Sequence, residues 1–214
     1  MATLHSVFLN TISEIGMARL EHPILYHAPI GIRFEIGDEE DGIYTKRGKA
    51  NPVYVEKAFH RAKEIFDSLP AFDLLRFDIY TEDRTEWPPR PLDLEDLSNI
   101  GLPQPKEKRT DIFHDDEGED FEIEVLYWDL SYQKIDFDKL LTEIIKADIG
   151  GFNELASAIY FVNTKEKIMY HLYDDRGLDV VAGTVETLQP FYENYNAWIL
   201  EYDREEIDQI FKVK

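Results

Sequence analysis

The side chains with the types and spacing to do chemistry gather in one short turn, Asp174-Asp175-Arg176-Gly177. Two adjacent carboxylates beside a guanidinium could bind a divalent cation or anchor a basic partner. His171 lies just before the turn on a strand-like run, which makes it the best candidate for a general base. A single histidine without an identified nucleophile is a weak signal, so a histidine packed in a sheet is the competing interpretation.

The same turn has a structural interpretation, which we favour. Aspartate side chains often accept hydrogen bonds from the backbone of their own turn, and glycine supplies the positive φ angle that other residues avoid. Arg176 can then pair with a neighbouring acid. We therefore assign structural roles to Arg176 and Gly177, and also to Asp203 and Arg204, because Asp203 with Glu206 three residues later resembles a helix-capping pair.

A second group of candidate residues lies between Thr81 and Asp120, a polar segment with five prolines that we expect to be a mobile acidic insertion. Its acidic run could attract a cationic partner such as a nuclease, whose own surface must be basic to hold phosphates, or it could be a solvated loop. Trp87 could pack the loop onto the domain, but tryptophan and arginine are also enriched at binding hot spots. The predicted partner-binding residues are Trp87, Arg90, Asp115, Asp116, Glu117, Glu119 and Asp120.

The sequence predicts no metal site and no cofactor. The acidic run does not fit the calcium loop of an EF-hand, and the nucleotide-binding and nucleophile-elbow motifs are absent. The chain has no cysteine, which excludes disulfides and suits a reducing compartment. None of the histidines shows zinc-ligand spacing; they are His5, His22, His27, His60, His114 and His171.

Charge limits the partners that we expect. The net charge is -21, and most of it falls between residues 71 and 130. An acidic surface repels phosphates and anionic lipids, so the sequence predicts a basic protein partner and no direct nucleic-acid or membrane binding, although the charge could also serve solubility alone. No window reaches the roughly 18 apolar residues of a membrane span, and the N-terminus does not resemble a signal peptide, so the expected location is the cytoplasm. No feature indicates an oligomeric state.

Apolar periodicity places these residues on a mixture of helices and strands. Strict alternation of the two is missing, which predicts a single α+β domain over residues 1–214, with helices packed on a mixed or largely antiparallel sheet of about six strands. A ferredoxin-like core or a diverged repeat is an alternative, although no residue-level repeat supports it. The expected strands are 30–37, 75–79, 121–127, 158–162, 167–173 and 178–182, and the main expected helices are 2–20, 52–69, 136–149, 184–199 and 203–211.

Two details of this pattern bear on the candidate residues. In the first strand, apolar Ile32 and Phe34 alternate with Arg33 and Glu35, so we expect both charges to face outward. The polar insertion could hold a short helix at residues 93–99, but it is otherwise expected to lack secondary structure.

Three pieces of the chain stand out as motifs: Gly31–Glu35 (GIRFE), Tyr173–Asp179 (YDDRGLD) and Asn196–Arg204 (NAWILEYDR). Together they resemble a bacterial family known only as a domain of unknown function, and the third piece is the most specific. The resemblance covers most of the chain and implies a bacterial cytosolic origin. The family has no agreed activity, so it implies no catalytic residues. In general character, acidic α+β proteins of this size also resemble immunity proteins that neutralise contact-delivered toxins.

The leading functional hypothesis is a non-enzymatic acidic protein that binds a basic partner, such as an immunity protein or an antitoxin-like inhibitor of a basic toxin. One alternative is a hydrolase that uses Asp174, Asp175 and His171. Another is a regulatory module whose acidic surface mimics nucleic acid. An enzyme would bring the three hydrolase candidates together in a concave pocket, whereas a binding protein would leave the carboxylates satisfied within the turn.

Overall fold

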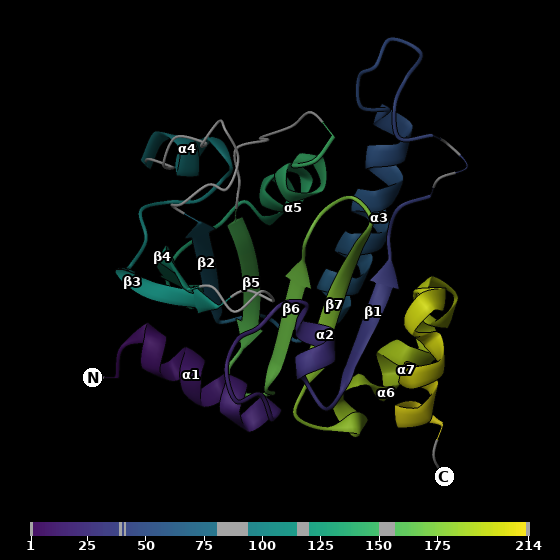
Figure 1. Ribbon diagram of the computed structural model, residues 1–214. Coiled ribbons are helices and arrows are strands. Elements are labelled where there is room, and N and C mark those ends of the chain that lie inside the picture. The colour runs from purple at the N-terminus through teal and green to yellow at the C-terminus, as the bar shows by residue number, and fades with distance from the viewer. Residues whose placement is uncertain are drawn as a thin grey trace.

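The computed structural model describes residues 2–38, 40, 42–80, 94–114, 120–149 and 157–212. These residues form one seven-stranded sheet in the order β1-β7-β6-β5-β2-β4-β3, with helices on both faces (Figure 1). The strands are β1 (Gly31–Glu35), β2 (Leu74–Tyr80), β3 (Glu107–His114), β4 (Asp120–Asp129), β5 (Ser157–Asn163), β6 (Ile168–Leu172) and β7 (Gly177–Ala182).

Every pair of neighbouring strands in this sheet is antiparallel. The predicted α+β class is therefore confirmed. In a ferredoxin-like arrangement a third strand separates the two strands of each βαβ unit, so neighbouring strands are antiparallel there too, and that alternative stays a prediction.

Helices form where the sequence supplies both an apolar stripe and a cap. Asn51 caps α3 by accepting a hydrogen bond from the Val53 backbone nitrogen (3.2 Å), and Pro52 occupies the first helical position. Asp136 and Thr184 cap α5 and α6 in the same way. The helices are α1 (Leu4–Ile15), α2 (Ile24–His27), α3 (Pro52–Ser68), α4 (Leu94–Asn99), α5 (Phe137–Lys146), α6 (Val185–Asn194) and α7 (Arg204–Phe211).

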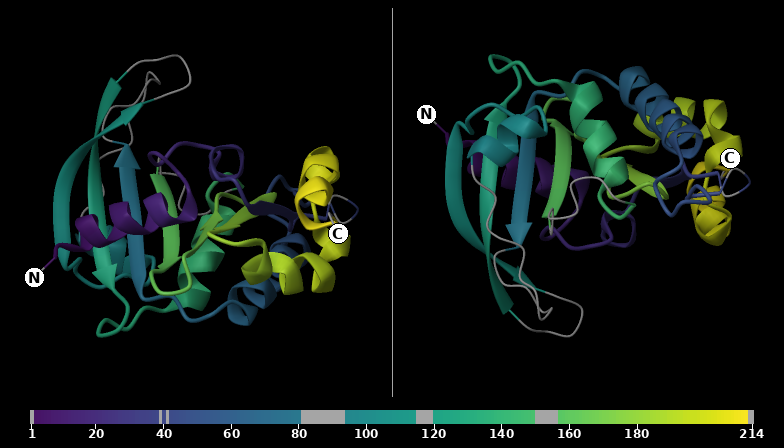
Figure 2. Two further views of the ribbon diagram at one scale, coloured as in Figure 1. Left: turned by 90° about the horizontal axis from the view of Figure 1, so that it is seen from below. Right: turned by 90° about the horizontal axis from the view of Figure 1, so that it is seen from above.

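The sheet separates two hydrophobic cores. On one face, side chains from α3, α5, α6 and α7 pack against alternate residues of the strands, and on the other face α1 and α2 cover the remaining residues (Figure 2). In β1, Ile32 and Phe34 face the first core, so Arg33 faces the second. The expectation that Arg33 faces outward is wrong: it is only 7% exposed, because both faces of the sheet are covered. Glu35 is exposed as expected.

The segment expected to be an insertion contains two regular elements. The short helix α4 matches the one considered there, but strand β3 was not expected, and it raises the sheet to seven strands. Apolar periodicity does not predict β3, because the strand lies at the edge of the sheet and fewer of its residues need to be apolar. Charged residues such as Lys108 and Arg109 are tolerated there, and they discourage pairing with other chains.

Most of the predicted partner-binding residues lie outside the described part of the chain: Trp87, Arg90, Asp115, Asp116, Glu117 and Glu119. Asp120 begins β4, and only its backbone is described. Across the described ranges, no helix has the length and apolar character that crossing a membrane requires.

Candidate functional site

A row of mostly polar side chains crosses the whole sheet on the face that α1 and α2 cover. Each member lies opposite the next on the adjacent strand, and at the β6–β5 step the rings of His171 and Tyr160 stack with their centroids 4.7 Å apart. We call this set the polar row. From β1 to β3 it consists of Arg33, Asp179, His171, Tyr160, Arg76, Tyr127 and Glu107.

At the β1 end of the row, one guanidinium contacts two carboxylates and a phenol hydroxyl. Arg33 donates to both oxygens of Asp179, through Nε at 2.7 Å and through the second terminal nitrogen at 2.9 Å. Its remaining terminal nitrogen lies 3.4 Å from Asp203 Oδ2 and 3.1 Å from the Tyr26 hydroxyl. Tyr26 in turn donates to Asp203 Oδ1 at 2.8 Å. We call these four residues the Arg33 cluster.

The Arg33 cluster joins the three motif pieces, which are far apart in the sequence. Arg33 belongs to Gly31–Glu35, Asp179 closes Tyr173–Asp179, and Asp203 lies in Asn196–Arg204. The backbones meet as well, since the Leu200 nitrogen donates to the Arg33 carbonyl oxygen at 3.0 Å.

Sequence reasoning missed Arg33 and Asp179 as site residues. A single charged residue in the middle of an otherwise apolar strand was the available signal, and Asp179 within Gly177–Ala182 shows it clearly.

The three charged residues of the Arg33 cluster are buried, and their charges are unbalanced. Asp179 is 0% exposed and Asp203 is 3% exposed, so two carboxylates share the single guanidinium of Arg33. Burial raises the pKa of the Asp179 carboxyl, although its hydrogen bonds with Arg33 oppose that effect. The cluster therefore keeps a surplus of negative charge whenever both carboxyls are ionised.

The centre of the polar row holds two histidines. His171 is 4% exposed, and its Nδ1 has no hydrogen-bond partner among the described residues. Its ring lies 5.1 Å from that of His22, which is hydrogen-bonded to the Tyr160 hydroxyl. Burial lowers the pKa of His171 well below its usual value, and His22 and Arg33 lower it further. His171 is therefore neutral at neutral pH.

Toward the β3 end of the row, β2 holds a second buried ion pair. Arg76 donates to both oxygens of Asp78, at 2.6 and 3.0 Å, and to the Tyr127 hydroxyl at 3.2 Å. His5 of α1 reaches the same hydroxyl through Nδ1 at 2.9 Å. Burial raises the pKa of Asp78. Because His5 lies on α1 and Tyr127 on β4, their hydrogen bond attaches α1 to the sheet.

The carboxylates of the candidate turn are engaged by neighbouring groups. Asp174 Oδ1 accepts from the Arg176 backbone nitrogen at 2.7 Å, and its other oxygen pairs with the Arg176 guanidinium. Asp175 accepts from the Tyr54 hydroxyl of α3 at 2.6 Å. These contacts match the structural interpretation of the turn.

Gly177 is required for a reason other than the one expected. Its φ angle is not positive, so that prediction is wrong. A Cβ atom at this position would lie 2.8 Å from the Phe34 carbonyl oxygen of β1. Gly177 therefore allows β7 to approach β1 closely at the point where β7 begins.

The expected capping role of Asp203 is also wrong. Asp203 precedes α7 directly, but its side chain makes no capping hydrogen bond and turns instead to Tyr26 and Arg33. Arg204 does have the structural role that was expected. Its guanidinium donates to the carbonyl oxygens of Asn196 (2.9 Å) and Ile199 (3.1 Å), and these hydrogen bonds join the two ends of the third motif piece.

The three candidate hydrolase residues are engaged by different neighbours. Asp174 and Asp175 bind Arg176 and Tyr54, whereas His171 packs against Tyr160, His22 and Tyr173. Within the ranges that the structure describes, no group of three or more potential metal-ligating side chains is found.

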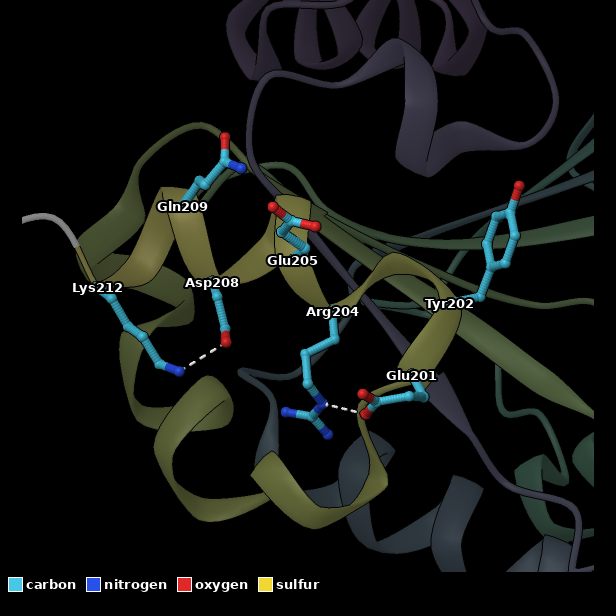
Figure 3. Close-up of a pocket in the computed structure, with 7 residues that line it drawn as sticks. All are labelled: Glu201, Tyr202, Arg204, Glu205, Asp208, Gln209 and Lys212. Carbon is cyan, nitrogen blue, oxygen red and sulfur yellow. Dashed lines mark hydrogen bonds and ion pairs between the residues drawn. The ribbon is translucent and has the colours of Figure 1, made fainter.

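An open groove runs along α7 and the turn before it (Figure 3). Its volume is about 660 Å³. Both cations in the groove are paired, Arg204 with Glu201 at 2.7 Å and Lys212 with Asp208 at 2.6 Å. The ring of Tyr202 points away from the other labelled side chains and is 86% exposed. The groove therefore combines an exposed aromatic ring with carboxylates.

The fold and the Arg33 cluster define an α+β protein whose antiparallel sheet carries a buried polar row, with three motif pieces joined at its β1 edge. The chain belongs to the family described as domain of unknown function DUF3885, whose model matches residues 8–203. That span includes Arg33, Asp179 and Asp203.

One curated relative is the uncharacterized protein YnaE of Bacillus subtilis (strain 168). It is 33% identical to this chain over 75 residues, which are 30% of the chain and 35% of that protein, so the match spans about a third of the relative's length. No solved structure matches the chain.

Proposed function

We propose that this protein is a non-enzymatic acidic protein that binds a basic protein partner in the bacterial cytoplasm, as an immunity protein or an antitoxin-like inhibitor of a basic toxin does. A net charge of -21 attracts a cationic protein from a distance and orients it on approach.

The observation that carries this proposal is the surface formed by the first turn of α7 and the residues before it. Glu201, Tyr202, Glu205 and Glu206 are all exposed there, and the first three line the open groove. Glu205 and Glu206 make no ion pair with the described residues, so both can meet a cation of the partner. Tyrosine is enriched at binding hot spots. We call these four residues the acidic C-terminal surface.

The contacts of the buried groups favour binding over hydrolysis. The turn carboxylates already have partners in Arg176 and Tyr54, which leaves the hydrolase hypothesis without an observation that favours it. The predicted residues of the insertion, from Trp87 to Asp120, stay in the proposal as a second contact region. The nucleic-acid mimic remains an alternative, and competition between DNA and this protein for a captured DNA-binding partner that has no toxin activity would favour it.

Affinity capture from a lysate of the bacterial host at low salt, followed by mass spectrometry, tests the proposal. We expect a basic protein whose affinity, measured with purified components, falls as salt rises. The double variant Glu201→Lys/Glu205→Lys should weaken binding by about tenfold or more.

The matched control is Glu56→Lys/Glu64→Lys on α3, which changes the net charge by the same amount at exposed positions of another helix. Its effect should be clearly smaller. Equal losses in the two double variants would show that only total charge matters, and failure to capture a basic protein would end the proposal.

A further inference from the structure

A second cavity lies on the other side of α7, between that helix and α2. Its volume is about 320 Å³. Its walls are largely apolar, with Leu25 and Ala28 on the α2 side and Ile207 and Ile210 on α7. A cavity of this size is at the small end of the range for ligand sites, and it suits one side chain better than a larger molecule.

The polar atoms of this cavity are acidic. Asp203 lines it, and this carboxylate already shares the guanidinium of Arg33 with Asp179, so its negative charge is incompletely balanced. Glu206 also lines the cavity and makes no hydrogen bond or ion pair with the described residues. The cavity therefore offers two carboxylates to a cation.

The aromatic wall of the cavity is already used to bind a guanidinium. Tyr26 lines the cavity and is 50% exposed. The Arg33 guanidinium carbon lies 4.9 Å from the centroid of its ring. Guanidinium groups stack on aromatic faces and are more weakly hydrated than ammonium groups, so they enter half-apolar sites at a lower desolvation cost.

We propose that this cavity receives an arginine side chain of the basic partner, an inference that rests on the function proposed above. The apolar stem of the arginine packs against Leu25, Ile207 and Ile210, and its planar head pairs with Glu206 and approaches Asp203 and Tyr26. A carboxylate and a guanidinium can form two parallel hydrogen bonds, which an ammonium group cannot reproduce. Glu206 belongs both to the cavity and to the acidic C-terminal surface, so one partner can use both.

The first test uses a small probe and requires no partner. N-acetyl-L-arginine methylamide is titrated into the full chain, up to the solubility of the probe, while the methyl NMR signals of Ala28, Ile207 and Ile210 are followed. We expect saturable shifts at these three methyl groups. The citrulline analogue, which has the same shape without the charge, should bind about tenfold more weakly or not at all, and the lysine analogue should also bind more weakly.

Two neighbouring glutamates provide a matched pair of variants. Glu206→Gln should weaken binding of the arginine probe about tenfold, whereas Glu205→Gln removes the same charge on the groove side and should change it less than about threefold. Ala28→Leu fills the cavity and should abolish the shifts at Ile207 and Ile210, with thermal unfolding used to verify that this variant folds.

The outcomes separate this inference from the proposed function. Binding of the probe that depends on Glu206 supports a guanidinium site even when no basic partner is captured. An absence of shifts, equal binding of arginine and citrulline, or tighter binding of lysine would overturn the inference. A captured partner whose affinity depends on Glu201 and Glu205 but is unaffected by Glu206→Gln and Ala28→Leu would also overturn it, while leaving the proposed function in place.

Discussion

Arg33 illustrates how a buried charge organises this protein. Its guanidinium makes paired hydrogen bonds to Asp179, which is completely buried, and it also reaches Asp203 and Tyr26. Removing one partner from such a pair leaves an uncompensated charge in a medium that solvates it poorly. Each residue of the Arg33 cluster is therefore held in place by the others, and the cluster stabilises the fold at the edge where the proposed cavity opens.

Asp179→Ala should lower the free energy of unfolding by about 3–5 kcal/mol, because Arg33 would lose its bidentate partner inside the protein. Urea unfolding followed by circular dichroism measures the change. Glu14→Gln is the control, since it breaks an exposed ion pair with Lys167 and should cost less than about 1 kcal/mol. Similar losses in the two variants would contradict a special role for the buried pair.

His171 should make stability sensitive to mild acid. The folded protein holds its pKa well below the usual 6.5, whereas the unfolded chain binds a proton near that value, so protonation favours unfolding as the pH falls below about 6.5. The stabilisation that comes from the neutral ring is complete above this pH and is lost progressively below it.

The test compares the wild-type protein with His171→Phe by urea unfolding between about pH 7.5 and pH 5.5. The stability of the wild type should fall relative to the variant by up to about 1.4 kcal/mol per pH unit once the pH is below 6.5. Subtracting the variant removes the contributions of the other histidines. Parallel curves for the two proteins would show that His171 does not titrate differently in the folded and unfolded states.

Among the elements, strand β1 has the largest part in assembling the site. It is short and pairs with β7 on one side, while its other side meets the third motif piece through a bridge between Phe34 and Ile199. That segment therefore covers an edge that would otherwise expose unpaired backbone groups. The approach of β7 to β1 depends on Gly177, and the same pairing brings Asp179 opposite Arg33.

Gly177→Ala should destabilise the protein by about 1–3 kcal/mol, because the added methyl group would press on the Phe34 carbonyl oxygen and force β1 and β7 apart. Tyr173→Phe is a useful second change, since the Tyr173 hydroxyl would also meet that methyl group. The double variant should recover only part of the loss. A fully stable Gly177→Ala protein would show that the strands have room to separate without cost.

At the scale of the whole molecule, the net charge of -21 opposes folding as well as recruiting a partner. Compact states suffer more from self-repulsion than expanded ones, and salt screens charges that are farther apart than the Debye length, which is about 10 Å at 0.1 M. The buried ion pairs of Arg33 and Arg76 are screened much less than the surface acids.

Raising sodium chloride from about 20 mM to about 500 mM should therefore increase the thermal unfolding midpoint by several degrees, while weakening the binding of a basic partner. Differential scanning calorimetry measures the first effect. A variant with Glu56→Gln and Glu64→Gln carries less charge and should gain less from salt. A midpoint that falls as salt rises would mean that attractive surface ion pairs outweigh the repulsion.

Much of the fold was predictable because its signals are local. Helix α3 combines an apolar stripe with Asn51 and Pro52 at its start, and six of the seven strands show apolar alternation or continuous apolar runs. Strand β3 was missed because an edge strand has one neighbour and needs fewer apolar residues. Of the candidate site, only the pairing within the turn was expected, since Asp174 and Arg176 are two residues apart.

The sequence by itself determined the α+β class, the positions of most elements, the excess of negative charge and the three motif pieces, because composition and short-range periodicity record all of these directly. Only the tertiary structure decided that Arg33 is buried and that it meets Asp179 and Asp203. These residues are 146 and 170 positions away along the chain, and their meeting depends on strand register and on helix α2 covering the second face of the sheet. Register and coverage arise from contacts between distant segments, which no local pattern encodes.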